Sequence, residues 1–177
     1  MDARLRGYSL LELSMTVALA ALLLTIGLPE FSRIGARQKQ SAEINALFHA
    51  VHLARKESIV RRQVVSLCPS FDGRTCTPGR DWSGGFLMFE NDDRDEPPRV
   101  DPGEAVLHRH TSNETIRISA NRRGFTLRAV FRRATNGTIV VCDRTGRIPP
   151  KALVISYTGR PRVAFETPRG EPYSCAD

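Results

Sequence analysis

Near its beginning the chain has an unbroken apolar segment, with no charged residue from position 13 to position 28. The wider stretch 8–28 is about 21 residues long, which at about 1.5 Å per residue is enough to cross a membrane as a helix. A secretory signal peptide would have a shorter apolar core and small residues at a cleavage site, whereas Pro29 and Glu30 follow here. One carboxylate, Glu12, lies inside the leading end of the segment. Because a carboxylate in a membrane helix is costly without a partner, Glu12 indicates more than a plain anchor.

Beyond the apolar segment, hydrophobic residues recur at three- and four-residue spacing, which is typical of an amphipathic helix. We therefore expect the helix to continue to about Arg61 or Arg62. Pro29 and Gly35 are the positions where such a rod is expected to bend or unwind locally. The residues that form the apolar stripe are Ile44, Leu47, Phe48, Val51 and Ala54.

After residue 62 the pattern changes to short alternating or apolar runs separated by turn residues, which predicts strands. Asn136-Gly137 is a hairpin signal between two of these runs. The fold class is therefore α+β, with one long N-terminal helix packed on an antiparallel β-sheet head. The expected strands are residues 64–68, 84–90, 105–110, 115–119, 125–132, 138–142, 152–157 and 163–166.

Charge is unevenly distributed along the chain, whose formal net charge is +7. The stretch 90–104 contains seven acidic residues and only two arginines, whereas the stretch 122–169 contains eleven basic residues and only two acids. Such separation suggests a basic face and a polyanionic partner, although a solvated surface has the same composition.

The chain has four cysteines, and an even number beyond a membrane segment indicates disulfides in an oxidising compartment. Three pairings are possible from the sequence. We favour Cys68–Cys76, which closes a short loop, and Cys142–Cys175, which would fix the C-terminus to a strand. A zinc site is disfavoured because no C-x-x-C spacing occurs, so we expect no metal and no other cofactor.

The N-terminal segment resembles the type IV pilin signal, in which a basic leader ends in Gly and Glu is the fifth residue of the mature chain. Gly7, Tyr8 and Glu12 fall in this register, with Tyr in place of the usual Phe. The resemblance implies that prepilin peptidase cuts after Gly7 and methylates the amine of Tyr8. It also implies that Glu12 pairs with the N-terminal ammonium of a neighbouring subunit and that other pilins or pseudopilins are partners through this helix.

These features divide the chain into four expected parts. Residues 1–7 would be a cleaved leader, 8–29 an assembly helix held in the inner membrane, 30–62 an amphipathic helix and 63–177 a β-rich periplasmic head. After assembly the protein would be part of a pilus or pseudopilus.

Later motifs resemble the GspH/FimT group of minor pilins and pseudopilins, and the resemblance spans nearly the whole chain. They are Cys68-Pro69-Ser70-x-Asp72-Gly73-x-x-Cys76, Trp82 with Gly85, and Ser156-x-Thr158-Gly159-Arg160-x-Arg162. The last element resembles the FimT branch, whose members are linked to DNA binding in natural transformation. The positions that match this element are Gly159, Arg160 and Arg162.

The same loop predicts binding on physical grounds. Gly159 permits a tight turn, and Pro161 stiffens the chain between two guanidinium groups, which lowers the ordering cost when they meet phosphates. Contacts of this kind would bind DNA without sequence preference. Alternatively, the two arginines solvate a hairpin or dock onto another pilin. Other basic residues close in sequence are Lys151, Arg147 and Arg144, and Arg132 and Arg133 are candidates to join them in space.

No catalytic constellation is recognisable, so we do not expect an enzyme. His49 and His52 lie at helical spacing, and His108 and His110 share a strand face, but the sequence places no third ligand beside either pair. The expected function is a FimT-like minor pilin that assembles into or primes a pilus and binds DNA. The alternative is a GspH-like minor pseudopilin of a type II secretion system with protein partners only.

Overall fold

The computed structural model describes residues 9–129 and 133–175, and α1 (Leu10–Arg61) is its longest element. The helix begins where Ser9 accepts a hydrogen bond from the backbone N–H of Leu11 on its side-chain oxygen. It ends at Arg61, within the predicted range, because Arg62 has a φ of 58° and takes the left-handed conformation that stops a helix.

The chain divides into two compact units after Gly35. In the first unit α1 has exposed apolar side chains, and an 18-residue window within the helix has a mean hydropathy of 2.0 and no buried part. By length and composition the helix can cross a membrane, a test that a signal sequence near the N-terminus also passes.

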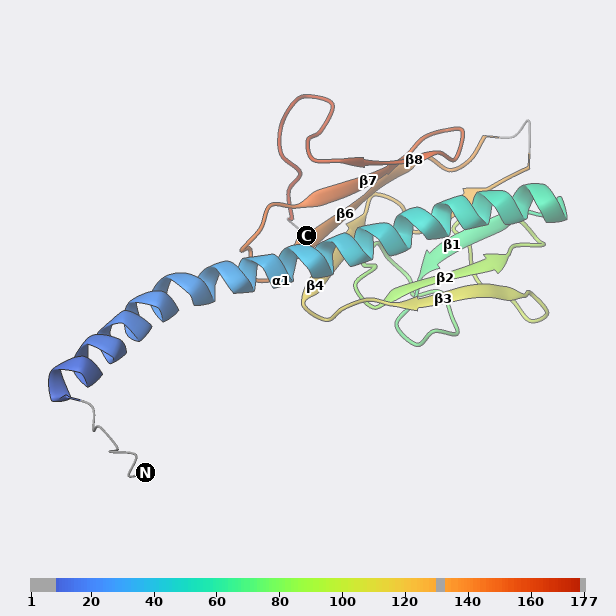
Figure 1. The fold of residues 1–177 in the computed structure, drawn as a ribbon. Coiled ribbons are helices and arrows are strands. Elements are labelled where there is room, and N and C mark those ends of the chain that lie inside the picture. Colours follow the sequence, from blue (N-terminus) through green and yellow to red (C-terminus); the bar gives the residue numbers. More distant parts are fainter. Residues whose placement is uncertain (1–8, 130–132, 176–177) are drawn as a thin grey trace. The chain divides into compact units, whose positions relative to one another are not determined.

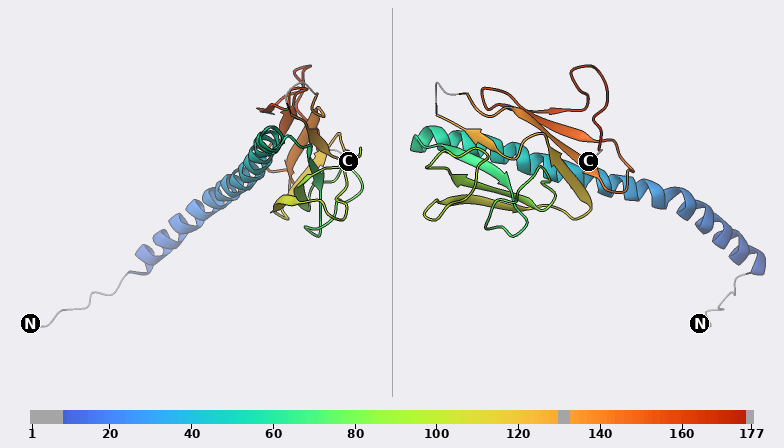
Figure 2. Two further views of the ribbon diagram at one scale, coloured as in Figure 1. Left: turned by 90° about the vertical axis from the view of Figure 1, so that its right-hand side faces the viewer. Right: turned by 180° about the vertical axis from the view of Figure 1, so that it is seen from behind.

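The second unit contains two four-stranded antiparallel sheets, in the orders β3-β2-β1-β5 and β4-β6-β7-β8. Figures 1 and 2 show β1–β3 along one side of the C-terminal half of α1 and β6–β8 along the other. The strands are β1 (Val65–Pro69), β2 (Gly85–Glu90), β3 (Val106–Thr111), β4 (Ile116–Ala120), β5 (Phe125–Leu127), β6 (Gly137–Asp143), β7 (Lys151–Ile155) and β8 (Pro161–Ala164).

The apolar stripe of α1 is buried against both sheets in one core. Leu47, Val51 and Ala54 have no exposed surface, and Trp82 lies beside Phe125 with 5.6 Å between the ring centroids. The expected fold class, a long helix on antiparallel strands, is therefore confirmed.

Two expectations about the sheets were wrong. The strands form two sheets instead of one, and Asn136-Gly137 does not close a hairpin, because β5 and β6 belong to different sheets. A side chain at Gly137 would approach Phe125 Cε1 to 2.9 Å and would crowd Asn121, so glycine is required here by close packing. The predicted strand 125–132 ends at Leu127, and residues 130–132 lie outside the described part.

Both favoured disulfides are present. Cys68–Cys76 closes the loop after β1, and Cys142–Cys175 fixes the C-terminal tail to β6. Because Cys142 lies opposite Arg117 of β4, on the face of the sheet that points away from the core, the tail lies over that outer face.

Candidate nucleic-acid interface

The turn between β7 and β8 is closed by hydrogen bonds of its own backbone. Gly159 N–H donates to the Ser156 carbonyl at 2.9 Å, and Ser156 N–H donates to the Arg160 carbonyl at 3.1 Å. Gly159 has a φ of +70°, and a side chain there would approach Leu127 Cδ1 to 2.8 Å. The position therefore requires glycine for both conformation and space.

Arg160 and Arg162 extend from the outer end of this turn and from the edge strand β8. Arg162 lies opposite Val154 in the β7–β8 register, so it shares the outer face of the sheet, and Arg160 stands two residues before it on the same side. Both side chains are exposed, whereas Pro161 between them is buried. Neither guanidinium forms an ion pair within the described residues. The two charges are therefore available to an external anion.

Arg133, a candidate from the sequence to lie near the two arginines, is beside this turn. Its guanidinium carbon lies 5.8 Å from the centroid of the Tyr157 ring, and Ala134 N–H donates to the Tyr157 carbonyl at 2.9 Å. The Tyr157 side chain is 60% exposed. Tyr157 was not among the residues predicted for the site, although an aromatic residue next to the Gly-Arg motif was the available signal.

Lys151 lies on the opposite side of the sheet from Arg162. Alternate residues of a strand lie on the same face, so Lys151 is on the face of β7 that carries the core residues Leu153 and Ile155. Its ammonium donates a hydrogen bond to Ser41 of α1 at 3.1 Å. It also lies 5.9 Å from the centroid of the Phe165 ring. Its charge is therefore directed toward the helix.

Arg147 is paired with the buried Asp143, at 3.5 Å between Nε and Oδ2. Burial raises the pKa of the Asp143 carboxyl, but hydrogen bonds from Thr145 and from the Arg147 backbone outweigh it, so the pKa lies below its usual value. Because Asp143 therefore stays ionised at neutral pH, the charge of Arg147 is partly neutralised.

Arg144 lines a hollow of about 660 Å³ on the outer face of the second sheet. Arg80 and Arg117 line the same hollow, together with Tyr173 of the tail. Arg144 is thus separate from the turn, but it lies on the face that Arg162 also shares.

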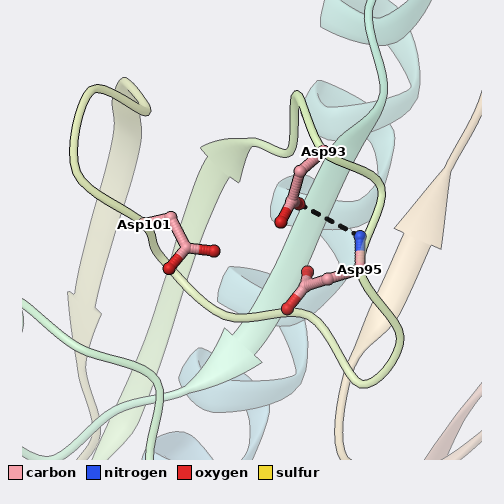
Figure 3. Close-up of side chains that lie close together, drawn as sticks. All are labelled: Asp93, Asp95 and Asp101. Atoms are coloured by element: carbon pink, nitrogen blue, oxygen red, sulfur yellow. Dashed lines mark hydrogen bonds between the residues drawn. The ribbon is translucent and has the colours of Figure 1, made fainter.

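A cluster of acidic residues lies on a different loop, which follows β2. Figure 3 shows Asp93, Asp95 and Asp101, whose nearest carboxylate oxygens all lie within 4.8 Å of one another. Asp93 accepts a hydrogen bond from the Asp95 backbone N–H, and Asp95 is itself bonded to Arg99. This loop joins β2 to β3 in the first sheet, and its Glu96 forms an ion pair with Arg128, whose guanidinium also donates to the Arg133 carbonyl.

The predicted processing residues Gly7 and Tyr8 lie outside the described part of the chain. Glu12 lies in the first turn of α1 and is exposed. A carboxylate in the first turn complements the positive end of the helix dipole.

Residues 43–167 match the protein family described as type II transport protein GspH. The chain is also similar to two crystal structures of the type IV minor pilin FimU from Pseudomonas aeruginosa PAO1. Their TM-scores are 0.52 and 0.54 and their identities 22% and 20%, with coverage of 78% and 79% of this chain and 99% and 97% of theirs. The minor pseudopilin EpsH of the type 2 secretion system of Vibrio cholerae has a TM-score of 0.50 at 9% identity, covering 71% of this chain and 96% of that chain. A comparison with curated proteins found no significant match.

The structural similarities show the shared fold, and the family match covers most of the chain. The apolar N-terminal helix agrees with a membrane-anchored pilin. The chain belongs to the GspH family of type IV minor pilins and pseudopilins.

Proposed function

We propose that this chain is a FimT-like minor pilin that assembles into or primes a type IV pilus and binds extracellular DNA during natural transformation. The observation that carries the proposal is the pair of exposed guanidinium groups, Arg160 and Arg162, on one face of a rigid turn without an ion-pair partner among the described residues.

Such a pair suits the phosphate backbone of DNA. Guanidinium groups donate several hydrogen bonds in a fixed geometry, and a preformed turn loses little conformational freedom on binding. Arg133 places a third positive charge beside the same turn, over Tyr157. Because phosphate contacts contain no base information, the binding has no sequence preference.

We expect the head, expressed from Ala36 onward, to bind duplex DNA with an affinity that falls as salt rises. Two or three phosphate contacts give a slope of about −2 to −3 in a plot of log affinity against log salt. Mobility-shift titrations at several salt concentrations, with duplexes of different sequence, measure this slope. Absence of binding at low salt, or binding to one duplex alone, would contradict the proposal.

At the other end of the chain, we propose that prepilin peptidase removes residues 1–7 in the inner membrane, with the head in the periplasm, and methylates Tyr8. The new ammonium would then pair with Glu12 of a neighbouring subunit. That pairing removes the cost of a lone carboxylate in an apolar environment and fixes the axial register of the two helices.

The intact mass of the protein isolated from cell membranes tests this processing. The expected mass is that of residues 8–177 plus one methyl group, with both disulfides formed. A mass that includes residues 1–7 would contradict the proposed cleavage. It would also contradict the proposed role of Glu12, because the ammonium with which it pairs would not exist.

A structural pseudopilin of a type II secretion system is the second candidate, and the description of the matching family favours it. On this alternative Arg160 and Arg162 dock onto another pilin. It would be supported if the head binds no DNA at low salt while deletion of the gene abolishes secretion.

A further inference from the structure

All histidines of the chain line one groove. The sequence contains four, and His49 and His52 of α1 meet His108 and His110 of β3 around a hollow of about 630 Å³. Lys56 lines the same groove. The fold thus brings together two histidine pairs that are separated by more than fifty residues of sequence.

The positions follow from the periodicities of the two elements. His49 and His52 are three residues apart on a helix and therefore share a side of α1, and His108 and His110 are two residues apart on a strand. In the β2–β3 register His108 lies opposite Met88 and His110 opposite Phe86, and both partners are buried in the core beneath α1. This face of β3 therefore points toward the helix.

Neighbouring side chains support the rings. Phe48 lies 4.6 Å from the His52 ring and 6.0 Å from the His49 ring, and Phe86 stacks on His110 at 5.0 Å between centroids. These contacts do not bury the imidazoles, since three of the four side chains remain exposed.

His110 is also oriented by a buried carboxylate. Glu43 Oε2 lies 2.8 Å from His110 Nε2, and Glu43 Oε1 accepts the Asn113 backbone N–H at 2.8 Å. The Glu43 side chain is only 6% exposed. A carboxylate that accepts the Nε2 proton leaves the Nδ1 lone pair for a ligand, as in carboxylate–histidine–metal arrangements.

We propose that the groove binds one divalent transition-metal ion through imidazole nitrogens from both the α1 pair and the β3 pair. Neutral nitrogen donors favour Cu²⁺ and Zn²⁺ over Ca²⁺ and Mg²⁺, which take oxygen ligands, and Cu²⁺ binds the tighter of the two. No three histidine ligand atoms lie within 4.8 Å of one another in the described residues, so binding requires the exposed rings of His49, His52 and His108 to rotate inward. Exposed rings do this rapidly and at small cost in side-chain entropy.

The test uses the full chain in detergent, purified without a histidine tag and freed of metal with a chelator. Isothermal titration with Cu²⁺ and with Zn²⁺ is expected to give one ion per chain, and the electron paramagnetic resonance spectrum of bound Cu²⁺ reports at least three nitrogen ligands. His49→Gln with His52→Gln is expected to lower the affinity by more than about 100-fold, and His108→Gln alone by at least about tenfold, because loss of an outer-shell partner already costs about 10- to 100-fold and these residues are the proposed ligands themselves.

The matched controls distinguish binding in the histidine groove from binding elsewhere on the surface. Lys56→Gln removes a like charge from the groove and is expected to strengthen binding severalfold, and Asp93→Asn with Asp101→Asn in the acidic loop is expected to leave it unchanged. Circular dichroism confirms that each variant is folded. Absence of binding, sensitivity to only one of the two histidine pairs, or loss of binding in the acidic-loop variant would overturn the proposal.

Discussion

Replacing Arg160 and Arg162 together with glutamine is expected to weaken DNA binding by the head about 10- to 100-fold at low salt and to reduce the salt slope by about two. The two side chains are exposed on one face and form no ion pair within the described residues, so the change removes two phosphate contacts without breaking an internal one. Glutamine keeps a polar side chain without the charge, and the turn hydrogen bonds, which use the backbone of Arg160, remain. The measurement is a mobility-shift titration over a salt series.

The matched control is Arg74→Gln with Arg109→Gln, which lowers the net charge by the same amount. Arg74 is exposed in the loop closed by Cys68–Cys76, and Arg109 is exposed on β3, so both belong to the other side of the head. We expect this variant to lose less than about threefold in affinity, through the general field of the protein alone. Equal losses in the two variants would show that net charge, and not the β7–β8 turn, determines DNA binding.

Gly85→Ala is expected to destabilise the head by about 3 kcal/mol or more, since it combines backbone strain with a steric overlap. Gly85 begins β2 with a φ of +122°, and a Cβ there would overlap the carbonyl oxygen of His110 on β3. That oxygen belongs to the backbone of a paired strand and cannot turn aside as a side chain can. Urea unfolding followed by Trp82 fluorescence measures the change in the free energy of unfolding.

Gly103→Ala provides the control for strain alone. Gly103 has a φ of +101°, but a Cβ there would have no atom within 4 Å. We expect a loss of about 1–2 kcal/mol, the cost of placing alanine in a left-handed conformation. If the two variants lose the same stability, the overlap with β3 contributes nothing.

Local sequence patterns were sufficient to predict the helix and most of the strands of this fold. The stripe from Ile44 to Ala54 and the turn residues located α1 and most strands to within one or two residues, because helix and strand periodicities are properties of neighbouring residues. Partition of the strands into two sheets depends on pairings between distant segments, and no local signal fixes these. The hairpin signal at Asn136-Gly137 failed for this reason, since Gly137 meets a packing requirement instead.

The candidate site was predictable in part. The Gly-Arg motif located the exposed arginines, because turn chemistry and charge are readable in sequence. The position of Lys151 on the opposite face was also readable, since it shares the parity of Leu153 and Ile155. The sequence could not predict that the two histidine pairs lie in one groove, because this depends on how α1 crosses the first sheet.

β8 is an edge strand of its sheet, and this position affects what happens when several heads lie close together. Along one side β8 has no strand partner in the described part of the chain, and such open borders readily recruit a strand from another molecule. Pro161 offers no N–H for such pairing, and the flanking arginines would bring like charges together if two of these borders met. In the proposed pilus, this would keep neighbouring heads from joining into a continuous β-structure and leave the same side of the protein open to solvent.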